Sequence, residues 1–245
     1  MKEHKLWQLQ QQWLTDYEWV DLSHEMSPET PHWSGFPAMV VEQKFDYPDG
    51  FYAHAYTTVG QYGTHVDAPS HFVQGARMLH ELRVDEMVLP LCVIDVREKI
   101  VNNDDYVVTV QDVLDWEAVN GRIPERSFVA ICTDWSKRDD LDNCDAEGNK
   151  HYPGWGMDVL KFLTQERHIH AIGHEASDTD STAESSVTGN LACEYYILSQ
   201  DCYQIELMRN LDKVPATGSL IFCGFPSVKD AGGFPARCIA LCPKE

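Results

Sequence analysis

Alternating stretches of apolar and polar residues predict most of the elements of this chain. Three near-continuous apolar runs, typical of strands buried on both faces, lie at residues 88–96, 127–134 and 168–172. Segments at 109–118 and 157–167 separate these runs and have features of helices. Strands and helices that alternate in this way predict an α/β fold in which helices pack against a partly parallel sheet.

The residues before this core predict one helix and then short strands joined by loops. Leu6, Leu9 and Trp13 have helical spacing within residues 2–17. We expect this N-terminal helix to pack on the domain or on a second subunit. Strands are expected at 19–23, 38–45 and 52–59, with a proline-rich loop at 27–37 and a turn at 47–50.

The C-terminal part predicts further short elements of the same domain. A helix at 190–200 and a strand at 203–206 come first. Late strands at 219–223 and 236–241 flank a glycine-rich loop at 231–235. Because the sequence has no internal repeat, linker or low-complexity tract, we expect residues 1–245 to form a single domain.

One short stretch concentrates polar chemistry, since it holds Gln61, His65, Asp67 and His71. In an extended strand, side chains two residues apart share a face. Gln61, His65 and Asp67 should therefore point the same way. Pro69 should end the strand in a turn that brings His71 back over them.

These four side chains are consistent with a metal site that has a base beside it. Imidazole, carboxylate and amide oxygen bind first-row metal ions, and a further histidine can move a proton near neutral pH. The alternative is a hydrogen-bonded pair of His65 and Asp67 at a strand end, with His71 as a loop histidine. The pattern alone leaves both interpretations open.

Other polar and aromatic residues lie where a ligand site is expected. The segment His174–Asp180 follows a buried strand, and Asp134 ends another. Ligand sites gather beyond the carboxyl ends of such strands. The alternative is that the acids and hydroxyls of His174–Asp180 cap backbone groups. Trp33, in the proline-rich loop, either lines a pocket for a flat ring or anchors packing.

Composition narrows the classes of partner. The net charge of −20 argues against nucleic acid and polyanionic substrates, and leaves a neutral or zwitterionic small molecule. No apolar run has the length of a membrane span, and the first ten residues are too polar for a secretory signal. The eight cysteines occur singly, without a Cys-x-x-Cys pair. We therefore expect a cytoplasmic protein whose thiols are reduced and mostly fill the core.

Residues 63–72, GTHVDAPSHF, resemble the signature of the cyclase-like metal-dependent hydrolases, the family of bacterial kynurenine formamidase and isatin hydrolase. The segments 31–35, 206–212 and 234–237 resemble other parts of that family, so the likeness spans about residues 19–243. It implies a swivelling β/β/α-type domain. It also implies that His65 and Asp67 ligate a metal ion.

The resemblance assigns further roles and shows two departures. His71 would be the catalytic acid and base, and Glu206 would ligate a second ion. Gln61 and Glu194 stand where the formamidase has histidines. Because both replacements offer oxygen, the set favours manganese over zinc, with one or two ions bound. The replacements indicate a side branch of the family with a substrate other than that of the kynurenine pathway.

The expected activity is metal-dependent hydrolysis of the C–N bond of an amide, formamide or cyclic amide. Trp33 and Phe36 would stack on an aromatic substrate, and His174 would be a second proton carrier or an orienting group. A lactone or ester hydrolase, and a binding protein without catalysis, are the alternatives. The expected assembly is a homodimer or a homotetramer.

Overall fold

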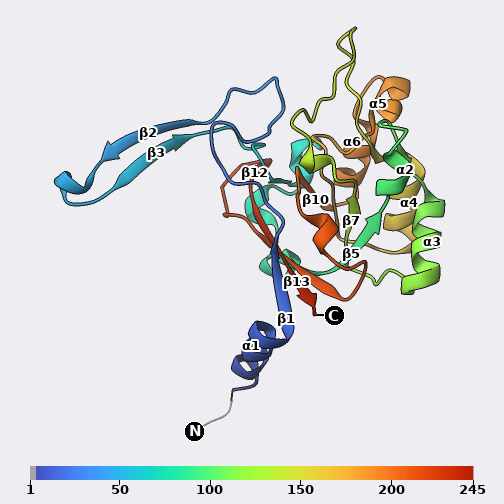
Figure 1. Ribbon diagram of the computed structural model, residues 1–245, viewed down its shortest axis with the longest axis horizontal. Helices are drawn as coiled ribbons and strands as arrows, with labels where there is room; N and C mark the ends of the chain where they lie inside the picture. Colours follow the sequence, from blue (N-terminus) through green and yellow to red (C-terminus); the bar gives the residue numbers. More distant parts are fainter. Residues whose placement is uncertain (1–3, 245) are drawn as a thin grey trace.

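A nine-stranded mixed sheet forms the centre of the computed structural model, which describes residues 4–244 (Figure 1). Four neighbouring strands in its middle run parallel, as predicted, and the strands on both sides pair antiparallel. In spatial order the strands are β1 (Tyr17–Asp21), β13 (Arg237–Pro243), β11 (Ser219–Gly224), β5 (Val88–Asp95), β7 (Phe128–Cys132), β9 (Ala171–Gly173), β10 (Tyr203–Glu206), β4 (His65–Asp67) and β12 (Gly233–Pro235).

Helices gather on one side of this sheet (Figure 1). They are α2 (Arg97–Ile100), α3 (Val110–Asn120), α4 (Met157–Glu166), α5 (Thr182–Thr188) and α6 (Ala192–Ser199). On β5, Cys92 and Ile94 belong to the core that contains apolar residues of α3, α4 and α6, whereas Leu91 and Val93 belong to the core of the opposite face. Because side chains alternate across a strand, the apolar run of β5 supplies both cores.

Several segments differ from the sequence-based expectation, among them the start of β9 and the glycine-rich loop. β9 begins at Ala171 rather than at His168, because His168 has a left-handed backbone with φ of 52°. The glycine-rich loop at 231–235 contains strand β12, which pairs with β4. A separate two-stranded sheet joins β6 (Val107–Val108) and β8 (Gly154–Trp155).

Two elements project from the body of the molecule: α1 (Lys5–Asp16), and an arm made of β2 (Val40–Phe45) and β3 (Ala53–Thr57) (Figure 1). The first residues of the helix predicted at 2–17 lie outside the described part of the chain. α1 buries none of its residues. A helix or hairpin that packs against nothing is only marginally stable in water. A second subunit could cover α1 and the arm. The expected homodimer or homotetramer stays a prediction. Within residues 4–244, no helix combines the length and apolarity needed to cross a membrane.

The cysteines fill the core, as expected. All eight are free thiols. Seven of them are buried, and Cys144 is exposed. Their contribution is therefore packing, in which a thiol behaves as a small apolar group.

Thr109, the first residue of the helical segment expected at 109–118, caps α3. Its hydroxyl accepts a hydrogen bond from the Asp112 N–H, and the Asp112 carboxylate accepts one from the Thr109 N–H at 2.7 Å. Lys99 and Tyr106 also donate to Asp112. Burial raises the pKa of Asp112, but these partners, Lys99 foremost, hold that pKa below its ordinary value.

We expect Asp112→Asn to lower the free energy of unfolding at pH 7 by about 1–3 kcal/mol, because an amide cannot accept all of these hydrogen bonds. A carboxyl group whose pKa is lowered by folding stabilises the fold above its unfolded pKa of about 4. This stabilisation is lost as the pH falls through the folded-state pKa. In urea denaturation the gap between the wild type and the variant should therefore shrink below about pH 4.

Asp115→Asn is the matched control, because Asp115 lies on the exposed face of the same helix. It should change the free energy of unfolding by less than about 0.5 kcal/mol. Equal losses in the two variants would contradict the role given to Asp112.

Candidate metal centre

Strand β4 lies between β10 and β12, and this pairing brings the predicted ligands together. His65 pairs with Glu206 on β10, and Asp67 pairs with Gln204 on the same strand. On the other side, Asp67 pairs with Gly233 of β12. Side chains of directly paired residues leave a sheet on the same face, about 5 Å apart. The three strands therefore present these polar groups on one face.

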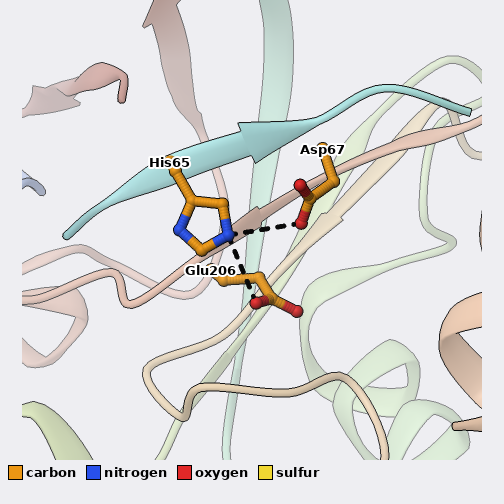
Figure 2. Close-up of side chains that lie close together, drawn as sticks. All are labelled: His65, Asp67 and Glu206. Atoms are coloured by element: carbon orange, nitrogen blue, oxygen red, sulfur yellow. Dashed lines mark ion pairs between the residues drawn. The ribbon is translucent and has the colours of Figure 1, made fainter. Parts of the chain in front are cut away.

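His65, Asp67 and Glu206 form a buried cluster, which Figure 2 shows with one imidazole nitrogen facing both acids. His65 Nε2 lies 3.3 Å from Asp67 Oδ2 and 3.4 Å from Glu206 Oε2. His65 Nδ1 lies 2.8 Å from the carbonyl oxygen of Gly63. Because a carbonyl oxygen only accepts, Nδ1 carries hydrogen. Neutral His65 therefore has its lone pair on Nε2, the tautomer that a metal ligand needs.

His71 and Glu194 form a second group around Asp67. The 3-10 helix at Pro69–His71 turns the chain after β4, as the proline predicted. His71 Nε2 lies 3.8 Å from Asp67 Oδ1 and 3.9 Å from Glu194 Oε1, which comes from α6. The turn therefore brings His71 back over the end of β4.

Gln61 reaches the site by another route than the predicted strand. β4 begins only at His65, because Gly63 has a positive φ of 60° and interrupts the extended chain. Gln61 Nε2 donates to Asp67 Oδ1 at 3.1 Å and lies 3.4 Å from His71 Nδ1. Its amide nitrogen faces the acid, so a role as a metal ligand would require the amide to turn about its last bond.

Burial makes the acids of this site strongly dependent on one another. Burial raises the pKa of Glu194 well above its usual range, and Glu206 and Asp67 add to the effect. Burial also raises the pKa of Asp67, but His65, together with His71 and Gln61, lowers that pKa to about 2. For His65, burial lowers the pKa, but Asp67 and Glu206 together raise it well above its ordinary value.

The donor set fits a divalent cation. One ligand atom from each of His65, Asp67 and Glu206 lies within 4.8 Å of the others, and the same holds for Asp67, His71 and Glu194. Within residues 4–244 no Lys or Arg side chain forms an ion pair with these three acids. Imidazole and carboxylate bind first-row divalent ions, and the carboxylate of Asp67, which belongs to both groups, has two oxygens to share.

An aromatic pocket of about 430 Å³ opens over these acids. Trp33 and Phe36 both line it and meet edge to face with ring centroids 4.8 Å apart, while their stacking on a substrate stays a prediction. Trp33 is 47% exposed, so it lies at the mouth. Lys150 and Tyr152 also line the pocket. Neither residue belongs to a motif, so the sequence pattern did not indicate them.

Gln204 is a further residue that the sequence analysis missed. Its Nε2 lies 3.2 Å or less from Asp67, Glu194 and Glu206. The signal that could have found it is its parity with Glu206, since residues two apart on a strand share a face.

His174 lies behind Glu206 and does not line the pocket. It is 1% exposed, and its Nε2 lies 3.3 Å from Glu206 Oε1. Of the two roles considered for His174, this position favours the orienting one, because a proton carrier needs access to the substrate.

The rest of the polar segment has mixed roles. Asp180 accepts hydrogen bonds from the backbone N–H groups of Cys193 and Glu194, both at 2.9 Å, and so holds the first turn of α6. This is the capping alternative. Asp178, in contrast, lines the pocket. Asp134 does not join the site, since it lines a separate surface hollow at the end of β7.

Comparison with known proteins places the chain among similar sequences and structures. Residues 20–181 match the family model Cyclase, described as "Putative cyclase". Isatin hydrolase of Roseibium aggregatum is 27% identical over 94% of this chain and 93% of its own. Isatin hydrolase A from Labrenzia aggregata, solved with benzyl benzoate, has a TM-score of 0.91 and 29% identity over 98% of this chain and all of that one. Isatin hydrolase A from Ralstonia solanacearum has a TM-score of 0.90 and 27% identity over 99% and 98% of the two chains.

The close packing of Gly233 against the site generates a test. A Cβ atom there would lie 2.4 Å from Gln61 Nε2 and 2.6 Å from Asp67 Oδ1, nearer than real Cβ atoms approach such groups. Because Asp67 would have to move, we expect Gly233→Ala to weaken binding of Mn²⁺ at least about tenfold. Calorimetric titration of metal-stripped protein with Mn²⁺ measures this affinity.

Gly232→Ala is the matched control. The nearest atom to its added Cβ would be His71 Cα at 3.3 Å, so a small shift accommodates it. The same Mn²⁺ affinity in both variants would show that Gly233 does not shape the site.

Proposed function

This chain belongs to the Cyclase family, whose model matches residues 20–181, and we propose that it is a metal-dependent hydrolase that opens the C–N bond of a small aromatic cyclic amide such as isatin. The observation that carries the proposal is the buried cluster of His65, Asp67 and Glu206 beneath an aromatic pocket. The similarity to isatin hydrolases supports ring opening over cleavage of a formamide.

His65, Asp67 and Glu206 would hold the ion, with Glu194 as a further oxygen donor and Gln61 as a donor after its amide turns. A bound Mn²⁺ or Zn²⁺ supplies a water of lowered pKa and polarises the substrate carbonyl. The chain contributes orientation, since the Gly63 carbonyl holds the His65 ring at Nδ1. The excess of oxygen over nitrogen donors favours manganese.

Proton transfer is assigned to His71. Its side chain is 28% exposed and lines the pocket, so it lies between the buried acids and a bound substrate. Hydrolysis of a C–N bond removes a proton from water and adds one to the leaving nitrogen, and one imidazole can do both in turn. Asp67 Oδ1 and Glu194 Oε1 lie 3.8 and 3.9 Å from His71 Nε2, so the imidazole sits directly beside the proposed metal ligands.

The pocket wall suits a flat ring that gains a charge on opening. Trp33 and Phe36 supply aromatic surface at the mouth. Hydrolytic opening of a cyclic amide converts its carbonyl group into a carboxylate that stays on the product. Lys150, a cation on the same wall, offers N–H donors to that group.

The proposal is tested by turnover of defined substrates with and without metal. Protein stripped with a chelator is reloaded with Mn²⁺ or Zn²⁺ and given isatin, an aryl formamide, a cyclic imide and an aryl lactone. We expect ring opening of isatin to exceed the other reactions, to disappear on stripping and to return with Mn²⁺.

The other outcomes would contradict parts of the proposal. Faster hydrolysis of the lactone would make the chain an ester hydrolase. Tight binding of isatin without turnover of any substrate would make it a binding protein. Activity that survives complete chelation would remove the metal from the reaction.

The role of His71 predicts a separation of activity from metal binding. We expect His71→Ala to lower kcat about 10²- to 10⁴-fold, because no other pocket group takes over the proton transfer. The affinity for Mn²⁺ should change by less than about fivefold, well under the change expected for a lost ligand. Stopped-flow assays and calorimetry measure the two quantities.

His54→Ala is the control, since His54 lies on the projecting arm. It should leave both quantities unchanged. If His71→Ala instead abolishes Mn²⁺ binding, His71 is a metal ligand and the assignment as the acid and base fails.

A further inference from the structure

A buried glutamine, Gln204 of β10, contacts all three carboxylates of the site. Its Nε2 lies 3.2 Å from Asp67 Oδ2, 3.0 Å from Glu194 Oε1 and 2.9 Å from Glu206 Oε1. The residue is 0% exposed. Its two amide hydrogens are therefore shared among three acids.

Thr179 determines which end of this amide faces the acids. The Thr179 hydroxyl donates to Gln204 Oε1 at 2.6 Å. If the amide were turned over, its oxygen would face three carboxylate oxygens without any hydrogen between them, which is repulsive. Thr179 is itself held in place, because its carbonyl accepts the Trp155 N–H at 2.9 Å. The orientation of the amide therefore follows from its partners.

The contacts of Gln204 also leave one oxygen of Glu206 and one oxygen of Asp67 free to face the imidazoles. Gln204 takes Oε1 of Glu206, and Oε2 then faces His65 Nε2 at 3.4 Å. Gln204 donates to Oδ2 of Asp67, which also faces His65 Nε2, while Oδ1 accepts from Gln61 at 3.1 Å and faces His71 Nε2 at 3.8 Å. One amide thus orders the acids of both groups in the site.

We propose that Gln204 is a positioning residue that holds Asp67, Glu194 and Glu206 ready for a divalent cation, and that Thr179 fixes its orientation. The inference rests on the proposed function only in that a divalent cation binds to these acids. Three carboxylates so close together repel one another, and a shared donor opposes their separation before the ion arrives. Groups that orient metal ligands in this way typically change affinity about 10- to 100-fold when they are lost.

The test is calorimetric titration of metal-stripped protein with Mn²⁺, together with the electron paramagnetic resonance spectrum of the bound ion. Gln204→Met keeps the length of the side chain but removes its hydrogen bonds, and should raise the Kd about 10- to 100-fold. Thr179→Val, nearly the same in shape, should raise the Kd about 2- to 10-fold and alter the spectrum. Thr179→Ser keeps the hydroxyl and should leave both the Kd and the spectrum as they are in the wild type.

Ser127→Ala is the matched control, since Ser127 is also fully buried and its hydroxyl has no partner within the described residues. It should leave the Kd unchanged. A wild-type Kd in Gln204→Met or Thr179→Val, or a Thr179→Ser protein as weak as Thr179→Val, overturns the proposal. If Gln204→Met does not fold, the two Thr179 variants decide. Because Mn²⁺ binding is read directly, failure to hydrolyse isatin would not affect the result.

Discussion

The site depends on the register of β4 between β10 and β12. Val66 pairs with Ile205 and with Phe234, and the side chains of Val66 and Ile205 are buried in the hydrophobic core. Because neighbours on a strand alternate, the same register places His65 and Asp67 on the opposite face. A slip by one residue would bury the polar pair in the core and expose the apolar one. Packing of an apolar core therefore positions the polar site.

The buried carboxylates of the site lower the stability of the fold unless hydrogen bonds or opposite charges compensate them. Within the chain, Asp67 receives hydrogen bonds from Gln61 and Gln204 and lies close to the imidazoles of His65 and His71. A divalent ion would compensate the buried negative charge more fully, because its two positive charges offset the excess of acids. Binding to the folded chain alone would then add to its stability by mass action. Metal loading and folding of this site are thus linked through the same carboxylates.

Around this floor, loops and short segments build the walls of the pocket. Trp33 and Phe36 lie before β2, and Lys150 and Tyr152 lie just before β8. None of them belongs to the central sheet. Loops vary more readily than the strands that carry them. Under the proposed function, the choice of substrate would therefore depend on these walls, whereas His65, Asp67 and Glu206 lie on strands of the sheet.

The sequence by itself determined the features that local periodicity encodes. The apolar runs predicted the parallel core, and the segment that begins at Thr109 predicted α3. Pro69 predicted the turn that returns His71 to Asp67. The motif at 63–72 indicated the family. Only the tertiary structure decided that β12 forms in the glycine-rich loop and that Gln204 donates to Asp67, 137 residues away along the chain. The reason is that local sequence fixes which face a side chain takes, whereas its neighbour across that face depends on which distant strands pair and in which register.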